Sequence, residues 1–229
     1  MSEVTLFETK DGSSSLLHTE LNETYHSTHG ALQESVYVFI DRGFTEALNQ
    51  GKKQISILEI GFGTGLNALL TLLEAQRIQV NVAYETLEAY PLPSEIVNKL
   101  NYVKLLEAKE GTNVLPLFDS LHSASWNEPN HVQPNFTLLK RKEDLLKATF
   151  EKEKFDLVYY DAFAPDKQPH LWEFPILEKV VSALKPGGIF VTYSAKGQLR
   201  RDLIALGLTV KKLPGPPGKR EMIQAIKLV

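Results

Sequence analysis

The chain has 229 residues, of which 43% are hydrophobic and 23% charged, and it contains no cysteine. This composition is typical of a globular protein, and the lack of cysteine excludes disulfides, zinc–thiolate sites, iron–sulfur clusters and cysteine nucleophiles. The formal net charge of −3 is unevenly spread, because residues 185–229 carry nine basic and two acidic side chains, a net +7 against −10 elsewhere. Either an anionic partner binds the C-terminal part, or these lysines and arginines only solvate the surface.

The chain begins with a predicted hairpin, in which segments 5–9 and 14–18 flank the turn dipeptide Asp11-Gly12. The start lacks the basic and then apolar pattern of a signal peptide. No apolar run approaches the roughly 20 residues that span a bilayer. We therefore expect a cytoplasmic protein without a membrane segment. Residues 30–44 place their apolar side chains on one helix face.

From residue 55 onward, apolar strands alternate with helices. The predicted strands are 55–60, 80–84, 136–139, 155–160, 189–193, 208–213 and 222–228. The predicted helices are 66–75, 94–100, 143–150, 172–184 and 198–206, the fourth being ended by a Pro-Gly-Gly sequence at 186–188. This order predicts a mostly parallel sheet covered on both faces. Residues 107–134 are the least regular, and we interpret them as a loop-rich insertion.

A glycine-rich loop follows the first of these strands, with Glu59, Gly61, Gly63, Gly65 and Asn67 in the sequence EIGFGTGLN. Dinucleotide-binding loops place their third glycine one residue later, and an acidic residue fits poorly beside a pyrophosphate. The pattern E-x-G-x-G-x-G resembles motif I of Rossmann-like methyltransferases, which bind the cationic S-adenosylmethionine. The alternative is a purely structural turn.

Acidic residues also follow the second and fourth strands. Glu85 and Glu88 lie about 20 residues beyond the glycines, where a carboxylate that binds ribose hydroxyls is expected, and we favour Glu88. Asp161 opens the sequence DAFAP, in which Phe163 could stack on an acceptor ring. The alternatives are a solvated carboxylate at the end of a strand and a helix-capping or turn aspartate.

The last two strands are joined by the sequence PGPPGKRE, in which Lys219 and Arg220 suit a phosphate, with Arg200 and Arg201 in support. The alternative is a solvated hairpin tip. His26 and His29 have the spacing of a metal pair, but no third ligand is identifiable, so a capping or hydrogen-bonding role is favoured. No hydrolase elbow and no phosphate-binding P-loop motif is present.

Six stretches together resemble one family, the methyltransferase domains of the bifunctional tRNA 5-methylaminomethyl-2-thiouridine biosynthesis proteins (MnmC) and their stand-alone versions. The stretches are ETYHSTHGALQES (23–35), ILEIGFGTGLNALL (57–70), LEAYPL (87–92), YYDAFAPDKQPHLW (159–172), LKPGGIFVTYSAKGQLRRDL (184–203) and GPPGKREM (215–222). The resemblance implies an α/β, Rossmann-like class I methyltransferase: a mostly parallel seven-stranded sheet with an antiparallel last strand. One domain is expected, with residues 1–50 as an N-terminal hairpin and helix extension and residues 51–229 as the core.

The same resemblance implies methyl transfer from S-adenosylmethionine to the amine of 5-aminomethyl(-2-thio)uridine at the tRNA wobble position. Asp161 would bind the amine and accept its proton, and Asp144 (or Glu143) would contact the adenine. The remaining expected substrate contacts are Tyr25 and Phe163 on the base, and Lys196, Arg200, Arg201, Lys219 and Arg220 on anticodon phosphates. Tyr193 and Trp172 are further candidate pocket walls.

We expect no metal, because the sulfonium methyl group is already activated, and no FAD, because 229 residues leave no room for the oxidase half of the bifunctional proteins. A monomer that binds the tRNA anticodon stem-loop is favoured. The rival predictions are a methyltransferase of a small amine or a protein side chain, and a non-catalytic module that keeps only the fold.

Overall fold

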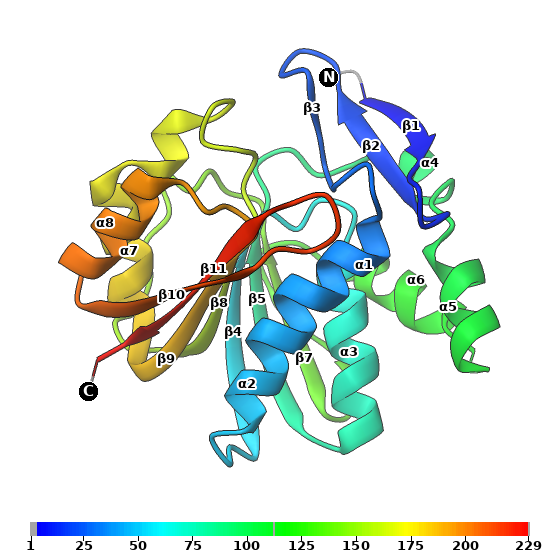
Figure 1. Ribbon diagram of the computed structural model, residues 1–229. Coiled ribbons are helices and arrows are strands. Elements are labelled where there is room, and N and C mark those ends of the chain that lie inside the picture. The colour runs from blue at the N-terminus through cyan, green and yellow to red at the C-terminus, as the bar shows by residue number, and fades with distance from the viewer. Residues whose placement is uncertain (1–3, 112, 229) are drawn as a thin grey trace.

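The computed structural model describes residues 4–111 and 113–228 (Figure 1). The predicted hairpin is present: β1 (Val4–Glu8) pairs antiparallel with β2 (Ser14–His18) around the Asp11-Gly12 turn. A short third strand, β3 (Glu23–Thr24), pairs with β2 and completes a small separate sheet. The Asp11 carboxylate accepts the backbone N–H groups of Ser13 in this turn and of Gln33 in the following helix, and so joins the hairpin to it.

Within the described residues, the main sheet has eight strands in the order β10-β11-β9-β8-β4-β5-β7-β6. Their bounds are β4 (Gln54–Ile60), β5 (Asn81–Leu87), β6 (Pro129–Gln133), β7 (Phe136–Arg141), β8 (Phe155–Tyr160), β9 (Leu184–Thr192), β10 (Leu208–Pro214) and β11 (Glu221–Lys227). The core from β7 to β9 is parallel, and β11 runs antiparallel to β9 and β10. The seven predicted strands and the antiparallel last strand are confirmed. The prediction of seven strands in total is corrected by β6, which pairs antiparallel with β7.

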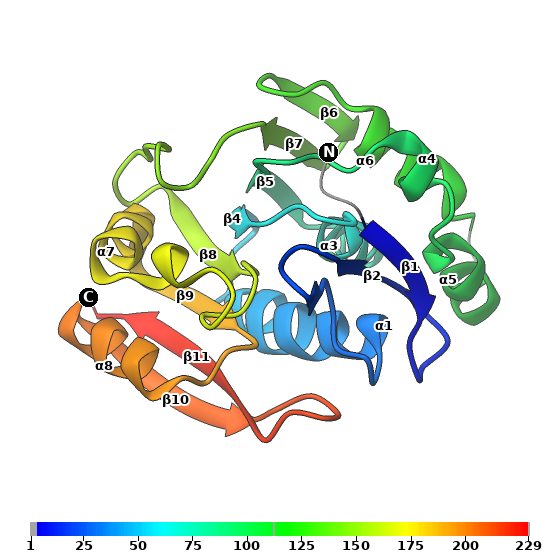
Figure 2. The same cartoon turned by 90° about the horizontal axis from the view of Figure 1, so that it is seen from above.

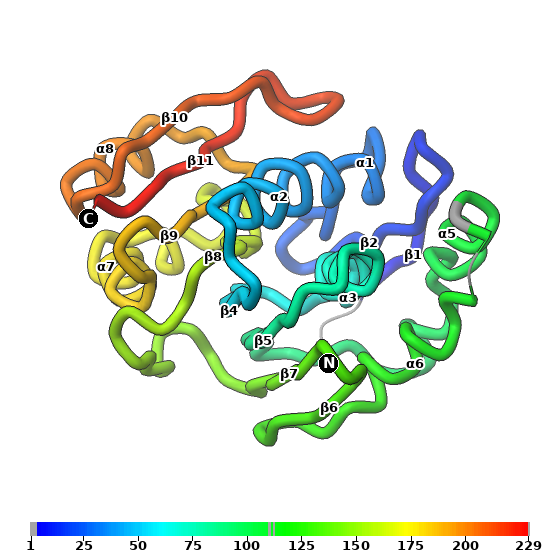
Figure 3. The backbone as a smooth tube through the Cα atoms, turned by 90° about the horizontal axis from the view of Figure 1, so that it is seen from below, coloured from blue at the N-terminus to red at the C-terminus, as the bar shows by residue number. Residues whose placement is uncertain are grey.

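Alternate residues of the central strands face opposite sides of the sheet. Ile57 of β4 packs with one apolar cluster and its neighbour Leu58 packs with the other. On the first face lie α3 (Leu66–Ile78) and the N-terminal helices, and on the second lie α7 (Phe174–Ala183) and α8 (Gly197–Ala205), as Figure 3 shows from below. Both faces are therefore buried, as the apolar strands predicted.

One continuous helical segment connects the small sheet to the large one. It comprises α1 (Ala31–Ser35), the wider π-helical η1 (Val36–Phe44) and α2 (Thr45–Leu48), so the predicted helix is confirmed and extends four residues further. Gly43 lets it approach the sheet, because a Cβ atom there would lie 3.0 Å from the Tyr159 ring and 3.1 Å from Val191. The N-terminal extension is thus packed directly on the main sheet.

Three predicted connections differ in the structure. Region 107–134 is not loop-rich: it holds the end of α5 (Tyr102–Glu110), then α6 (Leu115–Ser123) and β6, and α6 buries three apolar side chains. The helix predicted at 143–150 is absent, because the Asp144 carboxylate accepts the Leu146 N–H and the Lys179 ammonium binds the Leu145 carbonyl, so only one turn forms. Pro186-Gly187-Gly188 lies within β9, at an irregularity in its pairing with β8, and α7 ends before it.

The short α4 (Ser94–Val97) and the 3₁₀ turn η2 (Pro169–Trp172) complete the described elements. An ionic cluster around the buried Asp156 lies at the amino end of the sheet, where this carboxylate binds the ammonium groups of Lys52 at 2.7 Å and Lys185 at 2.9 Å. Burial opposes its ionisation, but hydrogen bonds from Lys52, Ser56 and Lys185 lower the pKa of Asp156 to about 2. In the residues that the structure describes, no helix is both long and apolar enough to cross a membrane.

Candidate active site

The carboxyl ends of β4, β5 and β8 meet beside the small N-terminal sheet, as the view from above shows (Figure 2). A cavity of about 360 Å³ lies at this edge. Its walls come from the loops after those strands, from the segment 23–27 and α1, and from the β10–β11 connection. The rule that ligands bind at the carboxyl edge of a parallel sheet is therefore satisfied.

Two of the three motif glycines line the cavity. Gly61 has φ +95°, and a Cβ atom on it would lie 2.8 Å from the Asp161 carbonyl oxygen. Gly63 has φ +50° and packs against the Tyr25 ring. Gly65, with φ +73°, precedes α3 and faces the His122 ring instead of the cavity. Gly61 therefore permits the ends of β4 and β8 to approach closely, Gly63 lies against Tyr25, and Gly65 permits the turn into the helix.

Glu59 is fully buried and does not line the cavity. Its Oε2 accepts a 2.7 Å hydrogen bond from the Thr86 hydroxyl, and its Oε1 meets no partner in the described residues. Burial raises the pKa of this carboxyl to about 8, and the nearby Asp161 adds to the increase. Glu59 lies beneath the glycine loop, and this position does not support the expected direct contact between Glu59 and a cofactor.

The two acidic candidates after β5 occupy different environments. Glu88 lines the cavity, and its two carboxylate oxygens each accept a backbone N–H at 2.9 Å, from Gly63 and from Tyr90. Glu85 lies outside the cavity and is buried in ion pairs with Arg141 at 2.9 Å and Lys154 at 2.6 Å. The geometry therefore gives Glu88 access to a ligand and gives Glu85 a structural role.

The acidic turn after β7 forms the next part of the wall. Glu143, Asp144 and Leu145 all line the cavity. Glu143 is paired with the Arg141 guanidinium, whereas Asp144 has one carboxylate oxygen on the Leu146 N–H at 2.9 Å. The expected adenine contact at Asp144 is consistent with this position.

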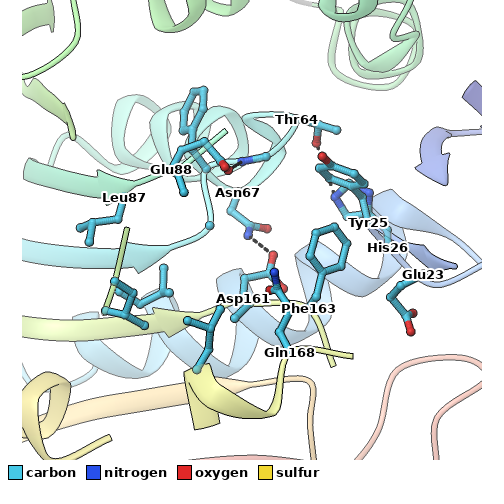
Figure 4. A pocket seen from close by; sticks show the side chains of 18 of the residues that line it. Glu23, Tyr25, His26, Thr64, Asn67, Leu87, Glu88, Asp161, Phe163 and Gln168 are labelled. Atoms are coloured by element: carbon cyan, nitrogen blue, oxygen red, sulfur yellow. Dashed lines mark hydrogen bonds between the residues drawn. The ribbon is translucent and has the colours of Figure 1, made fainter. Parts of the chain in front are cut away.

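Asp161 lies at the centre of the site (Figure 4). Its Oδ2 accepts a 2.9 Å hydrogen bond from the Asn67 side-chain amide, while the Asn67 carbonyl oxygen has no partner within the described chain. Burial raises the pKa of Asp161 to about 7; the charge of Glu34 raises it further, whereas Asn67 and Lys219 oppose the increase. A carboxyl with this pKa can accept a proton near neutral pH.

Aromatic side chains flank Asp161. Phe163 lies edge-on to Tyr25, with ring centroids 5.0 Å apart, and both line the cavity (Figure 4). The loop is held from behind, because the Trp172 indole donates to the Phe163 carbonyl and the Tyr193 hydroxyl donates to the Ala162 carbonyl, both at 2.8 Å. Tyr193 lines the cavity as expected, whereas Trp172 does not and packs on Tyr160 in the core.

The structure adds a residue that sequence reasoning missed. Glu34 of α1 is buried, lines the cavity and accepts the Ser27 N–H at 2.6 Å. Its other oxygen binds the Lys219 ammonium, which lies 3.7 Å from the centroid of the Tyr193 ring. Lys219 therefore sits in the cavity and not on an outer surface. In the sequence, Glu34 is marked as a possible site residue only by its place as a carboxylate within an amphipathic helix.

The other expected basic residues are exposed. Lys196 pairs with Asp166 at 2.7 Å on the surface, and Arg200, Arg201 and Arg220 are also exposed. Lys196 immediately precedes α8, which starts beyond the carboxyl end of β9. These side chains are consequently available to a large anionic ligand.

The histidines do not form a metal pair. His26 is buried with its ring nitrogens 3.2 Å from the Ser15 hydroxyl and 3.5 Å from the Thr64 hydroxyl, and burial lowers its pKa to about 4. His29 packs instead against Gly218. Across the described ranges, no group of three or more His, Asp or Glu side chains could hold a metal ion.

A family model described as "S-adenosyl-L-methionine-dependent methyltransferase" matches residues 132–228. The chain is 30% identical over 218 residues to the tRNA 5-methylaminomethyl-2-thiouridine biosynthesis bifunctional protein MnmC of Nitrosospira multiformis, covering 91% of this chain and 35% of that protein. It is 31% identical over 222 residues to MnmC of Pseudoalteromonas atlantica, with coverages of 91% and 31%. The chain thus spans about a third of the length of the curated relatives it matches.

The crystal structure of MNMC2 from Aquifex aeolicus superposes with a TM-score of 0.75 at 26% identity, covering 100% of this chain and 71% of that one. The chain is thus similar, over nearly its whole length, to part of the MnmC proteins. A CurJ carbon methyltransferase, with TM-score 0.50, 14% identity and coverages of 90% and 57%, shares the fold alone. These findings support an enzyme of the class I methyltransferase fold with S-adenosylmethionine as its cofactor, and they confirm the predicted resemblance.

The residues present fit this cofactor. Glu88 and Asp144 are carboxylates in the cavity wall, suited to the ribose hydroxyls and the adenine amine of the ligand, both of which are hydrogen-bond donors. Gly61 and Gly63 line the cavity, so their backbone can contact it, and the Asn67 carbonyl oxygen offers an acceptor with no partner in the described chain. A sulfonium cation is also favoured by the acidic lining.

Proposed function

We propose that this chain transfers a methyl group from S-adenosylmethionine to the exocyclic amine of 5-aminomethyl(-2-thio)uridine at the wobble position of tRNA. The observation that carries the proposal is Asp161, a partly buried carboxylate held by Asn67 at the cavity centre and flanked by Phe163 and Tyr25. The name of these relatives, tRNA 5-methylaminomethyl-2-thiouridine biosynthesis bifunctional protein, supports the choice of substrate.

The cofactor, when bound, supplies a methyl group on a positively charged sulfur. Glu88 would bind the ribose, Asp144 the adenine, and the backbone at Gly61 and Gly63 would lie against the ligand. Glu59 would act indirectly, because it lies beneath the loop and holds Thr86. Holding the two reactants in line can supply much of the rate, since positioning converts a bimolecular step into an effectively unimolecular one.

The acceptor must lose a proton before it can react. An alkylamine has a pKa of roughly 10 and is mostly protonated at neutral pH. Asp161, whose pKa is raised to about 7, would accept this proton. The freed lone pair would then take up the methyl group that the cofactor supplies, with the electrons of the C–S bond left on sulfur.

The substrate base would lie against the aromatic side chains beside Asp161. Phe163 and Tyr25 offer ring surfaces for a uracil taken out of the stack, which is how proteins commonly read single-stranded bases. Lys196, Arg200, Arg201 and Arg220 would bind anticodon phosphates near the mouth. We propose a chain that acts as one domain in the cytoplasm, where tRNA is available.

The test is incubation with labelled S-adenosylmethionine and tRNA that lacks the wobble methyl group, followed by nucleoside analysis. We expect label in 5-methylaminomethyl(-2-thio)uridine with the wild-type chain and none with Asp161→Ala. Label in a free alkylamine or a protein, with none in tRNA, would refute the proposal and favour the rival methyltransferase. Retained turnover in Asp161→Ala would refute the role of that residue alone.

A further inference from the structure

The β10–β11 connection carries a lysine from the C-terminal hairpin into the cavity. Its residues 215–220 form a shaped loop, in which the Gly215 N–H binds the Arg220 carbonyl at 3.1 Å and the Lys219 N–H binds the Pro216 carbonyl at 2.9 Å. The Tyr37 hydroxyl, donating to the Pro214 carbonyl at 2.8 Å, ties this loop to η1. In Figure 2 the loop reaches from the end of β10 toward α1.

The Lys219 ammonium occupies a site with the features of a cation-binding pocket. Glu34 supplies a carboxylate, and the Tyr193 ring presents its face at 3.7 Å from the nitrogen. A carboxylate and an aromatic face are the two groups that bind an alkylammonium most strongly. Glu34 does not depend on Lys219 for its position, because the Ser27 N–H holds its second oxygen at 2.6 Å.

This site adjoins the reaction centre. Both Glu34 and Lys219 act on Asp161 through their charges, the first raising and the second lowering its pKa. Glu34, Lys219, Tyr193 and Asp161 line the same cavity. Without the Lys219 ammonium, the negative charges of Glu34 and Asp161 would repel each other in a partly desolvated space, which is unfavourable.

A lysine side chain ends in the same group as the proposed substrate, a primary ammonium on a methylene carbon. We propose that Glu34, the face of Tyr193 and Asp161 form an ammonium site that receives the aminomethyl group of the substrate, and that Lys219 occupies this site until the substrate arrives. The inference rests on the proposed function for the identity of its ligand. Glu34 binds the substrate ammonium and directs it toward Asp161. The negative charge of the site is neutralised by Lys219 in the free protein and by the substrate ammonium once Lys219 is displaced.

The site itself is tested with ethylammonium chloride as the probe. Lys219→Ala and Lys219→Gly remove the internal ammonium, and we expect ethylammonium to raise their melting temperatures saturably, with a dissociation constant of about 1–10 mM, the range open to a ligand of three heavy atoms. The wild type, Lys219→Ala combined with Glu34→Gln, and Lys212→Ala should show no such increase. Lys212 is the matched control, since it is an exposed lysine of β10 whose partner is Glu221.

The role in the reaction is tested with Glu34→Gln, which keeps the shape of the side chain. We expect the KM for the aminomethyl tRNA to rise at least tenfold while the affinity for S-adenosylmethionine, measured by calorimetry, stays within twofold. An unchanged KM, or no stabilisation of either Lys219 variant beyond that given by potassium chloride, would overturn the inference. A wild-type chain that methylates no tRNA would refute the proposed function, while the ethylammonium measurement would still decide the site.

Discussion

Replacement of Glu88 by alanine tests whether the carboxylate that the structure places in the cavity binds the cofactor ribose. In the present state its two oxygens accept the N–H groups of Gly63 and Tyr90, both at 2.9 Å. Glu85, three residues earlier, is the matched control, because it is equally acidic but is paired with Arg141 and Lys154 outside the cavity.

The expected loss follows from the bonds that the carboxylate makes. A hydrogen bond to a charged group contributes about 1.5–3 kcal/mol, and a ribose diol would donate two. Part of this is offset, since Glu88 gives up backbone contacts when the ligand binds. A net loss of about 3 kcal/mol corresponds to an increase of about 100-fold in the dissociation constant of S-adenosylmethionine.

Glu85→Ala should instead lower stability, because it leaves the Arg141 guanidinium, only 18% exposed, without its buried carboxylate. Removal of one partner of a buried ion pair lowers the free energy of unfolding by about 3–5 kcal/mol. Because Lys154 is partly exposed, we expect a smaller loss of about 2 kcal/mol for Glu85→Ala. Calorimetric titration and chemical denaturation of both variants are the assays. Unchanged affinity in Glu88→Ala, or a 100-fold weakening in Glu85→Ala at intact stability, would refute this assignment.

Three further predictions follow from the geometry. Asp161→Asn should lower kcat at least 100-fold while the affinity for the cofactor stays unchanged. In the wild type, kcat/KM should rise as the pH increases through about 7, because the Asp161 carboxyl loses its proton there. A rate that does not change between pH 6 and 8 would contradict this role. The double variant Arg200→Glu/Arg201→Glu should weaken tRNA binding and reduce its dependence on salt concentration, measured by filter binding. The control Arg77→Glu, on the exposed surface of α3, should have neither effect. Equal effects of the two changes would mean that the tRNA binds elsewhere. The ionised Asp156 should contribute about 2 kcal/mol to the free energy of unfolding above pH 4, and this contribution should be lost as the pH falls toward about 2. Asp156→Asn should therefore be less stable than the wild type at neutral pH, and its stability should depend less on pH in acid denaturation. An unchanged acid profile would exclude this cause.

Local features of the sequence were sufficient for the parts of the site that lie on consecutive strand ends. The apolar runs at 55–60 and 155–160 predict buried parallel strands, and such strands place Gly61 and Asp161 at one edge. The alternation of strands and helices in the same way predicts the layered fold. These inferences succeed because strand period and chain direction are local properties.

Only the tertiary structure decided between Glu85 and Glu88, since both follow one strand and their difference lies in what surrounds them: Arg141 and Lys154 for the first, the cavity for the second. β6 was missed for a related reason, because it is a short edge strand defined by its pairing with β7.

The charge of the C-terminal part shows the same division. The sequence determined that the last 45 residues carry a net +7, and this indicated an anionic partner. Only the fold decided that Lys219 turns inward to Glu34, 185 positions away, while Arg220 next to it stays exposed. A contact of this separation depends on how the hairpin packs against α1, and no local pattern encodes it.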